Sequence, residues 1–557
     1  MSITATPLPA SVGVTREECK VILGSSLGTV FEWYDFFLYG SLAAIIGKAF
    51  FGAFPPATQE IFALLAFAAG SLVRTFGALV FGRIGDLVGR KYTFLVTILI
   101  MGLSTSLVGL LPGSATIGLW APSILIALRL LQGLALGGEY GGAAIYVAEH
   151  APSGRRGFYT SWIQTTATLG LFLSFAVILG TRGLVGENAF QVWGWRVPFL
   201  FSCVLLGISV WIRMQLSESP VFQRMKAEGK VSKAPLTEAF GRWSNIKIVL
   251  TALFGLVAGQ AVVWYVGQFY VLFFLQNILK VDGLTATLLL FWSLLLGSGF
   301  FVVFGWLSDK VGRKPIIIGG CLLAVVTYFP IFKAITELAN PALARALETV
   351  KVTVVADPAQ CGNLFNPVGT RTFTAPCDLA RAYLAQNSVR YDRQASPAGE
   401  PVRVLVNGTA VPFEADKLVE SRSAITVALQ AAGYPKAGDP GAVKMTNVFD
   451  LKNPNVPPII GLLFVLAIYV CMVYGPMAAT LVELFPARIR YSGLSLPYHI
   501  GNGWFGGLLP AAAISMVAQT GDIYFGLWYP IVIAGATLII GVLTVPETKD
   551  RDITGLD

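Results

Sequence analysis

Two stretches of the sequence, GRIGDLVGRK at Gly82–Lys91 and GWLSDKVGRK at Gly305–Lys314, share the pattern G-x-x-x-D-x-x-G-R-K. Five fixed positions recur in the same order, so chance is a poor explanation. They are Gly82, Asp86, Gly89, Arg90 and Lys91 in the first copy, and Gly305, Asp309, Gly312, Arg313 and Lys314 in the second. The repeat indicates that the chain contains two related halves.

The composition is that of a membrane protein. Of 557 residues, 55% are hydrophobic and 13% are charged, whereas a soluble protein carries about 25% charged residues. A run of about 20 apolar residues crosses a bilayer as a helix. Such runs predict twelve spans, near 21–47, 60–82, 92–112, 119–147, 157–180, 197–216, 246–276, 284–307, 315–337, 457–483, 491–518 and 522–545.

Basic residues gather in the loops that follow even-numbered spans. The loop after the second span holds Arg83, Arg90 and Lys91, while the loop after the third holds none. Loops rich in Lys and Arg stay in the cytoplasm. This bias predicts that both termini and both copies of the motif are cytoplasmic. It also accounts for the net charge of +9 without any nucleic-acid partner.

Further repeated sequence patterns support a duplication of six spans. The pattern E-x-x-P-x-x-x-R occurs at Glu149–Arg156 and again at Glu483–Arg490, and SESP after span six matches PETK after span twelve. The distance in sequence between matching positions of the two halves increases along the chain. This increase indicates an insertion between spans nine and ten. The predicted division is 1–20 (cytoplasmic), 21–216 (first bundle), 217–245 (cytoplasmic linker), 246–337 and 457–545 (second bundle), 338–456 (insertion) and 546–557 (cytoplasmic tail).

The insertion has no apolar run long enough to cross a membrane. Strand-like stretches at Val350–Asp357 and Val402–Gly408, and a helical pattern at Asp416–Ala432, predict a small α+β module. By the orientation above it lies outside the cytoplasm. In that oxidising compartment Cys361 and Cys377 are candidates for a disulfide, with two free thiols as the alternative.

The motif aspartates fall at helix ends. There a carboxylate can meet the positive N-terminus of a neighbouring helix or a nearby arginine. Such contacts would close one face of the protein and break when that face opens. The alternative is a basic loop with a tight glycine turn, but two copies at equivalent places favour the gating role for Asp86 and Asp309.

Ionisable groups at membrane depth are costly and point to function. They fall in the first half: Glu32 and Asp35 with Tyr39 on one face of span one, Arg74 in span two, and Arg129, Gln132 and Glu139 in span four. Counted this way, three acids face two bases. The unpaired acid would hold a proton when desolvated. We therefore expect Asp35, Glu32 and Glu139 as proton-coupling candidates, and Arg74 and Arg129 as carboxylate-binding candidates. A purely structural ion-pair network is the alternative.

The second half offers uncharged polar candidates for the opposite wall of a cavity. They are Gln260, Trp264 and Gln268 on span seven, Tyr469 and Tyr474 on span ten, and Tyr498, His499 and Asn502 on span eleven. For each of them, ordinary polar packing between helices is the competing interpretation.

Several stretches together resemble the major facilitator superfamily, and within it the metabolite:proton symporter family. They are EWYDFFLYG (Glu32–Gly40), FGRIGDLVGRK (Phe81–Lys91), the stretch Ile117–Ala143, EHAPSGRRGFYTS (Glu149–Ser161), WGWRVPF (Trp193–Phe199) and GWLSDKVGRK. The resemblance covers all twelve spans and not the insertion. It implies an all-α membrane fold of twelve transmembrane helices in two six-helix halves, and it also points at the acids of span one. RTFGA (Arg74–Ala78) departs from the family, which usually has Pro after the arginine.

The sequence therefore predicts a proton-coupled symporter of a small carboxylated metabolite that works by alternating access. It would be a monomer in the plasma membrane, the inner membrane of a bacterium by the resemblance, with no cofactor besides the proton. A uniporter or antiporter of the same fold is one alternative, and a receptor that uses the insertion is another. An enzyme is not expected, because the insertion contains no histidine and no nucleotide-binding glycine loop.

Overall fold

The computed structural model describes residues 16–52, 54, 56–364, 366, 372–436 and 441–553. Most of the predicted segment 1–20 and the end of the predicted tail 546–557 lie outside the described residues.

The first half consists of six long helices. They are α1 (Arg16–Phe50), α2 (Pro56–Leu87), α3 (Arg90–Leu110), α5 (Trp120–His150), α6 (Arg156–Val185) and α8 (Arg196–Met214). Short helices α4 (Ser114–Ile117) and α7 (Glu187–Ala189) lie in its connections, and α9 (Pro220–Ala227) and α10 (Pro235–Gly241) lie in the linker. Helices α1, α2 and α6 extend past both ends of their predicted spans, because apolar runs mark only the part that crosses lipid, whereas α3 and α8 end two residues before theirs.

The second half repeats this arrangement with broken helices. Its first span, Trp243–Ile278, consists of α11 (Trp243–Ala252), α12 (Ala258–Tyr265) and α13 (Val271–Phe273) with π-helical turns. The next spans are Gly283–Val311, made of α14 (Gly283–Gly297) and α15 (Phe300–Val311), and α16 (Arg313–Ala339). After the insertion come α20 (Val456–Tyr474) with α21 (Met477–Leu484), α22 (Arg490–Ile500) with α23 (Leu509–Thr520), and α24 (Trp528–Thr544). The prediction of twelve membrane-spanning helices in two halves is confirmed.

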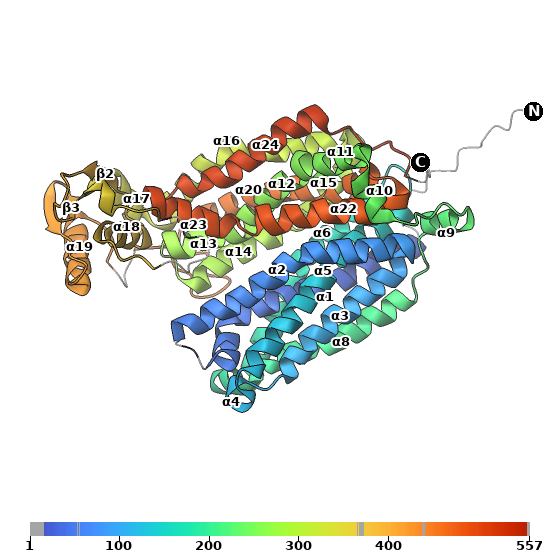
Figure 1. Cartoon of the computed structure of the whole chain (residues 1–557), viewed down its shortest axis with the longest axis horizontal. Helices are drawn as coiled ribbons and strands as arrows, with labels where there is room; N and C mark the ends of the chain where they lie inside the picture. The colour runs from blue at the N-terminus through green and yellow to red at the C-terminus, as the bar shows by residue number, and fades with distance from the viewer. Residues whose placement is uncertain are drawn as a thin grey trace, which may run out of the picture.

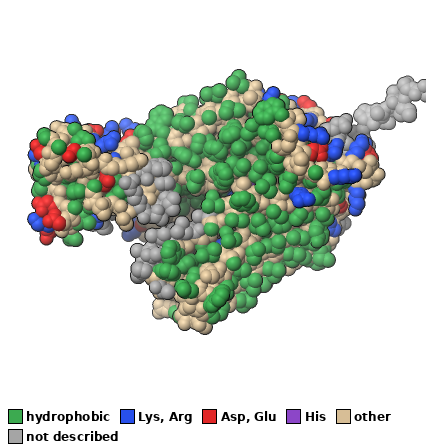
Figure 2. All heavy atoms as spheres, in the orientation of Figure 1, with side chains coloured by type: hydrophobic (Ala, Val, Ile, Leu, Met, Phe, Trp, Pro, Cys, Tyr) green, Lys and Arg blue, Asp and Glu red, His purple; other side chains and the backbone are tan. Residues whose placement is uncertain are grey.

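An apolar band surrounds the helices. Ten helical segments of the described residues are long and apolar enough to cross a membrane, and α1 and α2 add two long helices that carry more charge. In Figure 2 hydrophobic side chains cover the middle of the molecule, while Lys and Arg gather at the end bearing both termini and on the insertion. We call the end that holds Asp86 and Asp309 the motif face, and the opposite end the outer end.

The two halves lie side by side and touch mainly toward the motif face (Figure 1). Helix α6 packs on α15, α2 packs on α22, and α21 packs on α5 and α6. Each of these helices begins or ends at the motif face. The structure is therefore closed at that face.

Glycines permit close packing where the helices cross. A Cβ atom on Gly133 would collide with the backbone of Gly70, one on Gly137 with the backbone of α2, and one on Gly141 with Ser495 of α22. Small residues allow such close approach within a membrane. The glycine repeat of span four thus seats α5 against α2 and α22, and the polar side chains of these helices come together.

The insertion is a four-stranded sheet with helices. Its strands are β1 (Val352–Ala356), β2 (Asp392–Ala395), β3 (Arg403–Val406) and β4 (Thr409–Pro412), in the order β2-β1-β3-β4. β1 pairs with β2 in parallel and with β3 in antiparallel fashion. Asn407 and Gly408 both have positive φ between β3 and β4, as an Asn-Gly hairpin turn requires.

Three helices accompany this sheet: α17 (Pro341–Thr349), α18 (Pro376–Gln386) and α19 (Leu418–Ala432). The predicted strands and the predicted helix at Asp416–Ala432 correspond to β1, β3 and α19. Two strands and two helices were not predicted.

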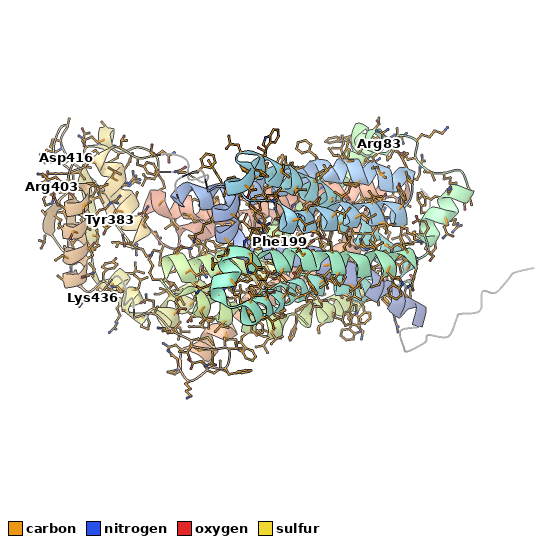
Figure 3. The ribbon with its side chains drawn as sticks, turned by 90° about the horizontal axis from the view of Figure 1, so that it is seen from below. Arg83, Phe199, Tyr383, Arg403, Asp416 and Lys436 are labelled. Carbon is orange, nitrogen blue, oxygen red and sulfur yellow. A yellow bond between two sulfur atoms is a disulfide. The ribbon has the colours of Figure 1, made fainter. Side chains whose placement is uncertain are left out.

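The insertion is fastened to the outer ends of the second half. Ser388 donates a hydrogen bond to the carbonyl of Ile278 at 2.7 Å, and Tyr391 donates to that of Ala518 at 2.9 Å. Trp292 donates from its indole to Val448 at 2.7 Å. In Figure 3 Tyr383, Arg403, Asp416 and Lys436 lie at the end of the molecule opposite Arg83. These contacts therefore fasten the insertion to the second half.

Cys361 and Cys377 form a disulfide that joins the segment after β1 to α18. We expect the double variant Cys361→Ala/Cys377→Ala to destabilise the insertion by about 3 kcal/mol, because the open chain regains conformational entropy on unfolding. Hydrogen exchange of the β1 and β3 amides would rise. Cys203→Ala, at an exposed free cysteine, is the control. Unchanged exchange in the double variant would show that the bond does not stabilise the module.

Candidate functional site

Four charged side chains and one amide from three helices of the first half surround a small cavity. Glu32 and Asp35 come from α1, Arg74 from α2, and Arg129 and Gln132 from α5. All five are buried. The cavity measures about 30 Å³, so it has room for a water or two and not for an organic ligand. Binding of such a ligand would require this region to widen.

Arg129 is the least satisfied of these groups. Its guanidinium carbon lies 3.5 Å from the centre of the Tyr39 ring, a cation–π contact. Its Nε and one terminal nitrogen have no hydrogen-bond partner among the described residues. Buried guanidinium donors are costly when unpaired, so Arg129 is suited to receive an anion. Tyr39 thus supports Arg129 without lining the cavity.

Asp35 and Gln132 have polar partners. Ser202 of α8 donates a hydrogen bond to Asp35 at 2.7 Å, and Gln132 donates to Thr105 of α3. No arginine or lysine of the described part of the chain lies within ion-pair distance of Asp35. A buried carboxyl without an ion pair favours its neutral form, as a group that takes up and releases a proton requires.

A second small cavity continues the first across the boundary between the halves. It measures about 20 Å³, and its lining combines Glu32, Trp33, Phe36 and Arg74 with Trp264, Tyr265, Tyr474, Tyr498 and Asn502. Gln260 contacts Asn502 at 3.4 Å. The structure thus brings the predicted residues Gln260, Trp264, Tyr498 and Asn502 together beside the charged cluster. Gln268 is buried but lines neither cavity.

Aromatic residues join the halves around this cavity. Trp33 and Trp264 pack with ring centres 5.7 Å apart. Toward the motif face Tyr140 stacks on Tyr498 at 3.7 Å, and the hydroxyls of Tyr498 and Tyr474 lie 2.6 Å apart. Sequence reasoning missed Trp33, Tyr140 and Tyr265, since aromatic residues are common in membrane helices and only their contacts across the boundary distinguish them.

The second half positions its polar residues with π-helical turns. Gln268 lies in the turn Val266–Tyr270 and Asn502 in the turn Gly501–Gly506. Such turns shift the helical register locally and are frequent at functional sites. A regular 3.6-residue period therefore misplaces residues beyond each turn, which is why Gln268 does not join Trp264 at the cavity. Gln260 also lines neither cavity and contacts the lining residue Asn502.

Glu139 does not belong to the cavity. It forms a buried ion pair with Arg213 of α8 and accepts a hydrogen bond from Thr97 at 2.9 Å. The prediction that acids outnumber bases is wrong, because it omitted Arg213, near the motif-face end of its helix. With Arg213 included, three acids meet three arginines. We assign Glu139 a structural role, whereas neither Glu32 nor Asp35 forms an ion pair within the described residues; Asp35 differs from Glu32 in accepting a hydrogen bond from Ser202.

The motif aspartates bridge the two halves with matching geometry. Asp86 accepts hydrogen bonds from the backbone N–H groups of Tyr491 and Ser492, at 3.2 and 2.8 Å, at the start of α22. Asp309 accepts from those of Gly157 and Phe158, both at 2.8 Å, at the start of α6. A carboxylate at a helix N-terminus is stabilised by the unpaired N–H groups and the helix dipole. Each half thus caps a helix of the other.

Ion pairs surround both caps. Arg90 lies 3.0 Å from Asp86, and Arg313 lies 2.7 Å from Asp309. The repeated glutamates also cross between halves: Glu149 pairs with Arg490 at 2.6 Å, and Glu483 approaches Arg156 at 3.7 Å. These contacts hold the motif face shut.

Backbone geometry explains the second glycine of each motif copy. Gly89 and Gly312 have φ of 140° and 116°, values that favour glycine. The N–H groups that follow them donate to Glu218 of SESP and Glu547 of PETK, at 3.1 Å from Arg90 and 2.9 Å from Arg313. The loop motif and the SESP or PETK segment therefore form one structural unit, which occurs once in each half.

Comparisons with known proteins agree with this architecture. The family described as "Sugar (and other) transporter" matches residues 21–239. The shikimate transporter of Escherichia coli is 36% identical over 341 residues, which cover 60% of this chain and 76% of that protein. A putative metabolite transport protein of Haemophilus influenzae is 27% identical over 545 residues, or 98% of this chain and 99% of its own. So complete an alignment leaves the insertion matched by a segment of similar length.

A solved structure shows the same fold at low identity. A double-tryptophan mutant of XylE superposes with a TM-score of 0.64 at 13% identity and covers 97% of this chain and 98% of its own. Fold, repeated motif and relatives all agree. The chain belongs to the major facilitator superfamily of membrane transporters, and within it to the metabolite:proton symporter family.

Proposed function

We propose that this transporter moves a small carboxylated metabolite together with a proton, by alternating access, across the plasma membrane of a bacterium. The observation that carries the proposal is the placement of Asp35, without an ion pair, beside Arg129, with unsatisfied donors, around one buried cavity. One residue is suited to a proton and the other to a carboxylate.

The proposed cycle begins in the state described above, with the motif face shut. A carboxylate reaches the cavity from the outer end and binds Arg129, with Arg74 on the neighbouring wall. Asp35 carries the proton. Filling the cavity favours closure at the outer end, and the caps at Asp86 and Asp309 then release. The substrate and the proton leave at the motif face, which the loop charges predict to be cytoplasmic.

The test is uptake into proteoliposomes that contain the purified chain. A panel of mono- and dicarboxylates and their neutral amides would be offered with and without an inward proton gradient. Accumulation of a carboxylate, and not of its amide, that follows the gradient supports the proposal. Uptake that ignores an imposed gradient would favour a uniporter or antiporter, and binding without any uptake would favour a receptor.

The caps at the motif face make a separate prediction. We expect Asp86→Asn/Asp309→Asn to raise maleimide labelling of a Ser495→Cys reporter about tenfold, because two charge-assisted helix caps across the halves are weakened. Ser495 is buried on α22 beside Gly141. Asp416→Asn, on the insertion, is the matched control. Equal labelling with and without the cap aspartates would mean that they do not hold this face closed.

A further inference from the structure

Two cavities far from the charged cluster lie where the insertion meets the outer ends of the second half. The larger measures about 470 Å³, and its polar lining includes Lys280, Asp282, Asn340, Asn387, Thr426 and Lys436. The other measures about 330 Å³ and lies between the ends of spans seven and eleven and the segment around α18. Lys280 lines both. Volumes of this size suit a small ligand.

Lys280 is held in place at this junction. Its φ of 58° lies in the left-handed region, which is uncommon for a residue with a side chain and occurs where the surroundings fix the backbone. Its ammonium donates a hydrogen bond to the carbonyl of Gln386 at 2.7 Å. The backbone of span seven and a carbonyl of α18 thus set the position of this charge.

This cation has no anionic partner within the part of the chain that the structure describes. No carboxylate of the described residues lies within 4 Å of Lys280. Asp282, two residues on, is occupied as a helix cap, accepting from the N–H of Thr285 at 2.9 Å and from its hydroxyl at 2.6 Å. Desolvation lowers the pKa of Lys280, and the side chain remains open to solvent, where a ligand can reach the ammonium.

We propose that the larger cavity binds a small organic anion, a carboxylate with an apolar body, through the ammonium of Lys280. Two of the three donors of that ammonium remain for the carboxylate. Leu343, Val389 and Leu429 line the same cavity and suit the apolar body. This site is separate from the central cavity and goes beyond the proposed function. Since the insertion is fastened to the second half, the site belongs wholly to that half.

Calorimetry on the full chain in detergent tests the site directly. The probe is benzoate, and benzamide is its uncharged counterpart. We expect benzoate to bind the wild type, benzamide not to bind, and Lys280→Gln to weaken benzoate about tenfold or more, since a hydrogen bond to a charged group is lost. Lys351→Gln, at an exposed lysine of the insertion, is the matched control. Equal benzoate affinity in Lys280→Gln and wild type, or equal binding of benzamide, would overturn the proposal.

A second measurement needs no variant. Acetic anhydride modifies lysines, and mass spectrometry of peptides from the labelled, then digested, wild type gives the rate at each residue. We expect benzoate to slow acetylation of Lys280 and not that of Lys351. Equal rates at Lys280 with and without benzoate would count against the site.

The source of the natural anion is decided by uptake. If Lys280→Gln raises the KM of the carried carboxylate, the site captures substrate on its way to the centre. If KM is unchanged while benzoate binding is lost, the site holds a separate anion. Both results are consistent with an anion site at Lys280. If the wild type binds benzoate but transports no carboxylate, the proposed symport is wrong and the anion site remains.

Discussion

The Asp35→Asn variant is expected to lose gradient-driven accumulation, so that the internal substrate concentration no longer exceeds the external one. Asparagine keeps the size of the side chain and still accepts the hydrogen bond from Ser202, but it cannot release a proton. Coupling requires a group that is protonated in one state and deprotonated in the other. Exchange of labelled for unlabelled substrate needs no net proton movement and should survive.

Two companion variants sharpen this experiment. Asp450→Asn, on the exposed insertion, controls for the substitution itself. Glu32→Gln tests the neighbouring acid, which lines both central cavities. The measurement is substrate accumulation and counterflow in proteoliposomes under an imposed proton gradient. Normal concentrative uptake by Asp35→Asn would remove Asp35 from the proton route. Loss of counterflow together with accumulation would instead assign Asp35 to binding or folding.

The architecture was predictable because its signals are local and repeated. Apolar runs give the spans, and the duplicated motif gives the two halves. The role of Asp86 and Asp309 was also expected in kind, since a carboxylate at a helix end has few suitable partners. The particular partners, the backbones of Tyr491 and Gly157, belong to helices far along the chain. They could be identified only once the halves were placed together.

The charged cluster was predicted in part, and its error has a physical cause. The predicted balance of three acids and two bases omits Arg213, which lies near the end of span six. Depth in the sequence does not measure burial in the bundle. Arg213 is 1% exposed, and its guanidinium also lies 3.5 Å from the centre of the Phe94 ring. A residue at a helix end can thus be as buried as one at the middle.

Contacts across the boundary between halves were the least predictable. Helical period shows which residues share a face, but not which face meets the other half. Trp33 and Tyr265 line the small cavity at the boundary between the halves, whereas Gln268, which the helical period selected, does not. The cavities beneath the insertion were equally hidden, since they combine Lys280 with residues more than a hundred positions away.

The second large effect is expected at Arg129. We predict that Arg129→Gln raises the KM for the carried carboxylate about a hundredfold, because a desolvated charge-assisted contact is lost. Arg129→Lys should recover little of this loss, since an ammonium cannot make the bidentate contact or the flat packing on Tyr39 that a guanidinium makes. Radiolabelled uptake at several substrate concentrations separates KM from the maximal rate.

The control for this prediction is another membrane arginine that does not face the cavity. Arg196 donates to the carbonyls of Gly109 and Leu111, at 3.0 and 2.6 Å, so Arg196→Gln tests for general damage to the first half. An unchanged KM in Arg129→Gln would exclude Arg129 from the binding site and leave Arg74 as the candidate. If Arg129→Gln weakens uptake of a neutral amide as much as that of the acid, Arg129 shapes the cavity but does not recognise the charge of the carboxylate. A loss confined to the acid means that this guanidinium meets the carboxylate.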